Sequence, residues 1–340
     1  MTNLEAATAV TPQRIFETLL YGRMRADALK AAIDLDVFTA IAEGARRPAE
    51  LASRCGADAR GLAVLCDFLC VDGFLARTGD AYELRDEARV FLDRHSPAYA
   101  GSVAAFLSGP GRIEASARIG DAVRRGGAER NDALVPDAAA WVSFAETMLP
   151  VVGPVAGLVA QYLGASSAGP LRVLDVAAGH GEFGIAIARA NLQASIDAVD
   201  WPAVLSVAER RADAAGIGSR FRAVPGDIFE LPLEGSYDLI LLPNFVHHFA
   251  PDVCARLLRK LHAALVPGGR LATVEFVPND DRVSPAWPAM FGLVMLTMTP
   301  AGRTYTLPEL LELLEDAGFS RNTAFALKPT PQTLVVSLTD

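Results

Sequence analysis

The stretch that most constrains this chain is residues 172–184, which read Arg-Val-Leu-Asp-Val-Ala-Ala-Gly-His-Gly-Glu-Phe-Gly. The β-branched and aliphatic residues at its start favour a short strand buried on both faces. Three glycines follow at 179, 181 and 184, and helical spacing of apolar residues resumes at Ile185. A strand, a glycine turn and a helix in this order bring backbone N–H groups close to a ligand, and glycine removes the Cβ that would block it. A plain turn is the alternative interpretation of such glycines.

Acidic residues after successive strands strengthen the ligand-site interpretation. Asp175 stands at the end of the first predicted strand, Asp200 closes the next apolar run, and Gly226-Asp227 follows the third. A carboxylate at the Asp200 position can hydrogen-bond a ribose diol. From residue 170 onward strands and helices alternate, which predicts an α/β domain with a parallel sheet and right-handed crossovers.

The strands of this domain are expected at 172–176, 195–199, 220–224, 237–242 and 270–277, with Pro267-Gly268-Gly269 before the last of them. Thr306 is a candidate cap for a final helix that stops near Gly318. Two apolar runs, 322–327 and 333–338, follow this helix and predict a closing pair of strands.

Composition limits the class of protein. The 340 residues are 51% apolar and carry a net charge of −9, which argues against nucleic acid or an anionic membrane as the main partner. The four cysteines form no C-x-x-C pair, so we expect no metal site and a reducing compartment. The first 14 residues lack an apolar signal core, and prolines and glycines interrupt the apolar stretch 148–165. We therefore expect a cytoplasmic protein with no membrane span.

The first hundred residues predict three helices and a hairpin, the order of a winged helix. The helix expected at 58–71 would read DNA, yet it carries one basic residue, Arg60, against Asp58 and Asp67. Broad apolar helix faces favour dimerisation instead. The expected domains are 1–105 for dimerisation, 106–165 as connecting helices, and 166–340 as the α/β domain.

Two adjacent histidines, His247 and His248, follow the fourth predicted strand. Ligands of open α/β sheets bind at the carboxyl ends of strands, so either imidazole can act as a general base. A histidine that caps a helix or bonds the neighbouring loop is the alternative.

These features together resemble class I S-adenosylmethionine (SAM) methyltransferases, and the whole layout resembles plant-type O-methyltransferases and their bacterial relatives. The features that carry the resemblance are Asp175 before the glycines, the Gly226-Asp227 pair and Pro267-Gly268-Gly269. The resemblance implies a Rossmann-like seven-stranded sheet, mostly parallel with one antiparallel strand, and an N-terminal all-α winged-helix dimerisation domain. It also implies a homodimer, SAM as methyl donor, S-adenosylhomocysteine (SAH) as product, and no metal.

The resemblance assigns cofactor contacts residue by residue. The backbone of Ala177 to Gly181 would line the methionine part of SAM, Asp200 would take the ribose hydroxyls, and Trp201 would pack near the adenine. The remaining contacts would come from the loops after the strands at 220–224 and 237–242: Gly226, Asp227, Ile228, Phe229 and Asn244. Ala177-Ala178 stands where relatives often have Gly-Gly. Alanine is small enough for the turn if φ stays negative, so SAM binding is expected to survive.

The resemblance also selects the base. The family's histidine precedes a Cys by seven residues and a Leu by eleven, which matches His247 with Cys254 and Leu258. His248 then stands where the family has Asp, and a slip of one residue would select His248 instead. Glu275 matches the Glu that steadies the histidine, with an exposed strand-end Glu as the alternative. The family's second Glu is missing, because Gly302 occupies its position.

The resemblance implies that two apolar segments hold the acceptor, although the sequence alone favours ordinary helix packing for both. Met and Phe in them suit a planar apolar molecule. Their residues are Trp141, Phe144, Met148, Met290, Phe291, Val294, Met295 and Met298.

The predicted function is metal-free methyl transfer from SAM to a phenolic or polyketide-like hydroxyl of a small molecule. Methylation of nitrogen or carbon, and a SAM-binding winged-helix regulator, remain alternatives. The sequence does not name the acceptor.

Overall fold

The computed structural model describes residues 10–130, 135, 139–233 and 236–340. It divides into two compact units, Met1–Pro110 and Gly111–Asp340. The helices predicted as connectors lie, from residue 111 onward, within the second unit.

The first unit has the predicted order of helices followed by a hairpin. Thr11 caps the first helix and Asp58 caps the fourth, each side chain accepting a backbone N–H of the first turn. One buried core, built around Phe38, Leu69 and Tyr82, joins the helices to the hairpin. The elements are α1 (Pro12–Asp34), α2 (Val37–Ala42), α3 (Pro48–Cys55), α4 (Ala59–Val71), β1 (Leu75–Thr78), β2 (Ala81–Leu84), α5 (Asp86–Leu92) and α6 (Val103–Leu107).

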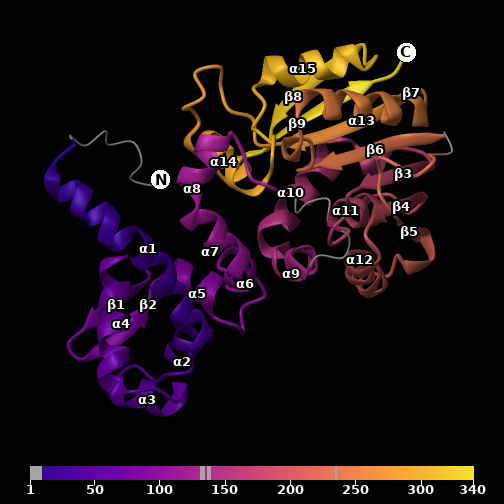
Figure 1. Cartoon of the computed structure of the whole chain (residues 1–340). Helices are drawn as coiled ribbons and strands as arrows, with labels where there is room; N and C mark the ends of the chain where they lie inside the picture. Colours follow the sequence, from indigo (N-terminus) through magenta and orange to yellow (C-terminus); the bar gives the residue numbers. More distant parts are fainter. Residues whose placement is uncertain (1–9, 131–134, 136–138, 234–235) are drawn as a thin grey trace. The chain divides into compact units, whose positions relative to one another are not determined.

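The second unit is built on a seven-stranded sheet with the order β5-β4-β3-β6-β7-β9-β8 (Figure 1). Neighbouring strands run parallel except β9, which is antiparallel to both β7 and β8. The predicted sheet with one antiparallel strand is therefore confirmed. Its strands are β3 (Leu171–Val176), β4 (Ala194–Asp200), β5 (Phe221–Pro225), β6 (Tyr237–Pro243), β7 (Leu265–Glu275), β8 (Arg321–Ala326) and β9 (Thr333–Leu338).

Alternating side chains of the strands enter two separate cores, one on each face of the sheet. Leu174 and Val176 join the core under α13 and α15, whereas Val173 joins the core under α10 and α11. The helices of this unit are α7 (Pro110–Ala117), α8 (Ile119–Arg125), α9 (Ala139–Thr147), α10 (Leu149–Tyr162), α11 (Glu182–Ala190), α12 (Pro202–Ala214), α13 (Pro251–Ala264), α14 (Ala286–Met298) and α15 (Leu307–Asp316).

The predicted start of the fifth strand was wrong. Pro267-Gly268-Gly269 lies inside β7 rather than before it. Leu265 pairs with Tyr237, but the next pair joins Arg270 to Leu239, so the pairing register of β7 with β6 shifts across this turn. The strand also ends at Glu275, two residues earlier than expected.

Among the described residues, no single helix is long and apolar enough to cross a membrane. Taken together, α9 and α10 pass the length and composition test, but they meet at a bend of 68°.

Candidate active site

The glycine turn after β3 is closed by backbone and carboxylate hydrogen bonds. Ala178 N–H donates to the carbonyl of Val199 at 3.0 Å, and Gly179 N–H donates to Asp200 Oδ2 at 2.8 Å. The predicted negative φ at Ala177 is wrong, since its φ is +51°. The left-handed backbone places an alanine in a conformation that favours glycine, at a cost of about 1 kcal/mol.

Asp175 is fully buried beneath this turn. Its Oδ2 accepts the backbone N–H of Gly184 at 2.9 Å, whereas its Oδ1 has no hydrogen-bond partner within the described part of the chain. Burial, with a smaller contribution from the charge of Asp200, raises the pKa of Asp175 to about 7.

The end of β4 joins the glycine turn to the next loop. Asp200 accepts N–H groups from Gly179 and from Trp201, the latter at 2.7 Å, and its carbonyl accepts Gly226 N–H at 3.0 Å. The ring of Trp201 packs with residues of α9 and α12, among them Ala145 and Val204. Asp200 therefore ties together the loops after β3 and β5.

The loop after β5 carries the residues predicted to hold adenine. Asp227 Oδ1 accepts Phe229 N–H at 2.9 Å, and Lys260 Nζ donates to the carbonyls of Ile228 and Phe229. Asp227, Phe229 and His248 also line a pocket of about 530 Å³ beside α13. Two of the predicted adenine residues, Asp227 and Phe229, thus border a cavity.

Asn244 leaves β6 with a φ of +52°, and its N–H donates to the carbonyl of Val274 at 2.7 Å. Its Oδ1 is buried without a hydrogen-bond partner among the described residues, as is Asp175 Oδ1. Such orphaned acceptors are rare and call for a donor. They lie at the carboxyl ends of neighbouring strands, β6 and β3, so the residues present fit a ligand that carries an ammonium group, as SAM does.

His247 and Glu275 form a buried pair. His247 Nδ1 lies 2.5 Å from Glu275 Oε2, and the backbone N–H of His247 donates to Oε1 of the same carboxylate at 3.3 Å. The two residues are only 4% and 2% exposed, so the alternative of an exposed strand-end Glu is wrong. With Nδ1 bonded to a carboxylate, Nε2 is the nitrogen left to exchange a proton.

His248 lies beside this pair without the same support. Its ring centroid is 4.4 Å from that of His247, and Trp141 meets its ring edge-on at 5.6 Å. Its Nδ1 is buried and bonds to no other described residue. Burial, aided by His247 and Arg112, lowers the pKa of His248 well below its ordinary value.

The missing second glutamate has a steric explanation. A Cβ on Gly302 would lie 2.5 Å from the carbonyl oxygen of His247 and would also meet Thr299 Oγ1. The same carbonyl accepts the N–H of Arg303 at 2.9 Å. The backbone around His247 therefore occupies the space that any side chain at 302 would need.

The predicted acceptor residues divide into two groups. Phe291 meets the His247 ring at 5.0 Å and Trp141 meets His248, while Phe144 contacts the glycine turn. For the others the structure gives burial and packing: Met290 on α14 is 60% exposed, Met295 is buried, Met148 packs against the core under α10 and α11, and Val294 and Met298 are partly buried.

Sequence reasoning missed three aromatic residues of the site. His180, inside the glycine turn, stacks on Phe144 at 5.9 Å. Phe276 and Trp287 stack on each other at 5.6 Å, and Phe276 also meets Phe291 in a tilted contact at 4.4 Å. The position of Phe276, directly after Glu275, is a signal that could have found it.

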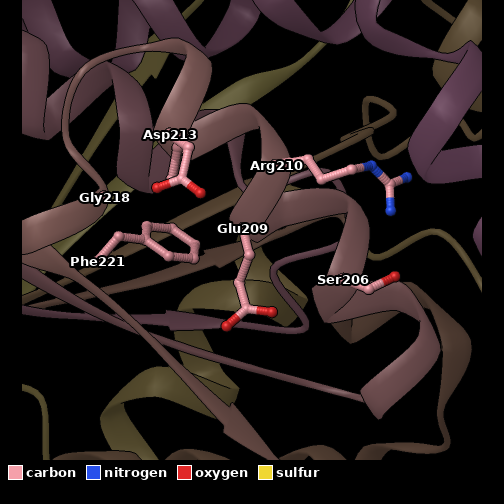
Figure 2. A pocket seen from close by; sticks show the side chains of 7 residues that line it. Ser206, Glu209, Arg210, Asp213, Gly218 and Phe221 are labelled. Atoms are coloured by element: carbon pink, nitrogen blue, oxygen red, sulfur yellow. The ribbon is translucent and has the colours of Figure 1, made fainter.

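A second pocket, of about 450 Å³, lies where α12 meets the start of β5 (Figure 2). Its polar lining comes from Ser206, Glu209, Arg210 and Asp213, and it includes none of the predicted site residues. Within the described ranges, no group of three or more His, Cys, Asp or Glu side chains is placed to hold a metal ion.

Comparison with known proteins identifies the family. A model of the O-methyltransferase domain matches residues 159–320, and a model of the O-methyltransferase dimerisation domain matches residues 17–94. The chain belongs to the O-methyltransferase family. It is therefore a SAM-dependent enzyme that methylates hydroxyl groups of small molecules, which favours oxygen over the nitrogen and carbon alternatives.

Three similar proteins illustrate the match. The chain is 31% identical over 329 residues to acetylserotonin O-methyltransferase of Mus musculus molossinus, covering 91% of this chain and 84% of that one. It is 29% identical to the tetracenomycin polyketide synthesis 8-O-methyl transferase TcmO of Streptomyces glaucescens, with 91% of each chain covered. The crystal structure of an O-methyltransferase from Nostoc punctiforme aligns with a TM-score of 0.93 at 39% identity, covering 98% of this chain and all of that one.

Proposed function

We propose that this enzyme methylates a phenolic or polyketide-like hydroxyl, with His247 as general base and Glu275 as the residue that orients it. The observation that carries the proposal is the buried 2.5 Å contact between His247 Nδ1 and Glu275. The aromatic rings around it, Phe276, Phe291 and Trp287, suit a flat acceptor. The similarity to TcmO, named for a polyketide, supports this acceptor class.

SAM would be held by the turn from Ala177 to Gly181, by Asp200 at the ribose, and by the Gly226–Phe229 loop at the adenine. The orphaned oxygens of Asp175 and Asn244 would accept donors from its amino-acid end. Bound SAM supplies a methyl group on a sulfonium, which is already an activated leaving group, so the proposal gives no role to a metal.

The chain's own residues would do two things. The aromatic side chains would orient the acceptor, because catalysis of such a displacement depends on alignment. His247 Nε2 would take the proton of the hydroxyl, since a phenol with a pKa of ~10 is mostly protonated at neutral pH. Glu275 would fix the tautomer of His247 and stabilise the imidazolium that forms.

We also propose a homodimer formed through the first unit. The matched dimerisation domain covers residues 17–94, and α1 exposes apolar side chains such as Phe16 at 60% and Leu19 at 79%. An exposed apolar helix face of this kind suits an interface with a second copy. Light scattering of the purified protein tests this, and a mass of one chain would contradict it.

The test of the reaction combines calorimetry with turnover. Binding of SAM and SAH is measured first, and SAH release is then followed with a panel of phenols and hydroxynaphthoates. His247→Ala is expected to keep SAM affinity and lower turnover by about 10²–10⁴-fold. His248→Ala serves as the matched control, and its turnover should fall less than that of His247→Ala. Unchanged turnover in His247→Ala, or a larger loss in His248→Ala, would remove His247 as the base.

A further inference from the structure

The turn after β3 contains an imidazole that the proposed reaction does not use. His180 is 3% exposed, and its ring stacks on Phe144 of α9, with centroids 5.9 Å apart and planes 23° apart. The His180 ring also stacks against Phe183 of α11, with centroids 6.4 Å apart. A Cβ on Gly179 would lie 3.8 Å from Phe144 Cε1, so the phenyl ring also lies against the turn itself.

Hydrogen bonding fixes the form of this imidazole. Nδ1 of His180 accepts the backbone N–H of Glu182 at 3.0 Å, so the proton of the neutral ring is on Nε2. Burial, with a smaller contribution from Arg211, lowers the pKa of His180 to about 3. At neutral pH the ring is therefore a flat, uncharged surface, which suits stacking on a phenyl ring.

Helix α9 makes a second aromatic contact one turn earlier. Trp141, three residues before Phe144, meets the ring of His248 edge-on at 5.6 Å. Residues three apart share a face of a helix, so one face of α9 spans both the glycine turn and the histidine loop. The position of α9 against the glycine turn therefore determines where Trp141 and Phe144 lie relative to the reacting groups.

We propose that His180 is a positioning residue, whose ring seats α9 on the glycine turn and so places Trp141 and Phe144 over the cofactor and the acceptor. The inference rests on the proposed function, because it takes the turn to be the SAM site. His180 acts through Phe144 and is not itself a catalytic residue. Loss of one stacked pair should raise the equilibrium constant for local opening of α9 by a factor of about 2–10.

Two substitutions separate stacking from hydrogen bonding. His180→Asn keeps an acceptor for Glu182 N–H but loses the ring, whereas His180→Phe keeps the ring but loses the acceptor. His262→Ala is the matched control, because His262 also packs on a phenylalanine, Phe319, at 5.0 Å, but from α13. The readout is amide hydrogen exchange of residues 139–147, with and without saturating SAH, together with SAH affinity from calorimetry.

The α9 amides of His180→Asn should exchange about five-fold faster than those of the wild type when each protein is saturated with SAH. The α9 amides of His180→Phe and His262→Ala should exchange at the wild-type rate. The reverse order, with His180→Phe impaired and His180→Asn normal, would show that the bond to Glu182 matters instead and would overturn the proposal. Failure of the wild type to bind SAH would refute the proposed function, while the exchange of the free proteins would still decide the role of His180.

Discussion

At the scale of single residues, Ala177 is the position where the chain conflicts with its own geometry. Its φ of +51° belongs to a region that glycine adopts without strain. We expect Ala177→Gly to raise the free energy of unfolding by about 0.5–1 kcal/mol, the relief of strain exceeding the entropy that glycine adds to the unfolded chain. Urea denaturation measures it. Ala178→Gly is the control and should lose stability, because Ala178 has no positive φ; equal losses in both variants would contradict the argument.

Asp175 is a second residue that costs stability, in this case because its ionised carboxylate is buried. Its pKa of about 7 in the folded state exceeds the value of about 3.9 for an unfolded chain, so the folded state binds the extra proton between these values. Stability from this group is full below about pH 4 and is lost as the pH rises to 7. Asp175→Asn should therefore melt several degrees higher than the wild type at pH 8 and close to it at pH 4.5, in calorimetric scans. An equal difference at both pH values would exclude a titrating Asp175.

At the scale of elements, the segment 299–305 closes the loop that carries His247. Gly302 leaves no room for a Cβ beside the His247 carbonyl. We expect Gly302→Ala to cost about 1–3 kcal/mol of stability through overpacking and to lower kcat by displacing His247. Gly157→Ala, on α10 with no atom within 4 Å of the new Cβ, is the control and should gain about 0.5–1 kcal/mol. Urea denaturation and turnover are measured for the two variants. A Gly302→Ala variant with wild-type stability and turnover would show that the backbone around His247 can shift to accommodate a Cβ.

The same elements show how far the sequence could predict the molecule. Strand–helix alternation and local apolar runs are short-range signals, so β3 to β6 were predicted within one or two residues. The spacing from His247 to Cys254 is also local, because both lie on the segment from the end of β6 into α13. The sign of φ at Ala177 and the stack of His180 on Phe144 depend on groups far away in the chain, and no local pattern encodes them.

At the scale of the whole molecule, buried titratable groups give the second unit a stability that depends on pH. The pKa values of His180 and His248 are both held below the ordinary value of about 6.5. The unfolded chain therefore binds more protons at these two positions than the folded chain does below pH 6.5. Their contribution to stability is present above that pH and is lost as the pH falls, opposite in sign to that of Asp175.

Between about pH 4.5 and 6 the unfolded chain binds more protons at the two imidazoles, and the folded chain binds more at Asp175. The net difference is close to one proton, so these groups together should raise the unfolding free energy by ~1.4 kcal/mol per pH unit as the pH rises. All three tryptophans, Trp141, Trp201 and Trp287, lie in the second unit, so tryptophan fluorescence in urea reports its unfolding alone. His180→Phe removes one imidazole, which should lower the measured slope by ~1.4 kcal/mol per pH unit relative to the wild type. If His180→Phe leaves this slope unchanged, His180 is protonated or exposed in the folded enzyme. The neutral ring stacked on Phe144 would then not exist.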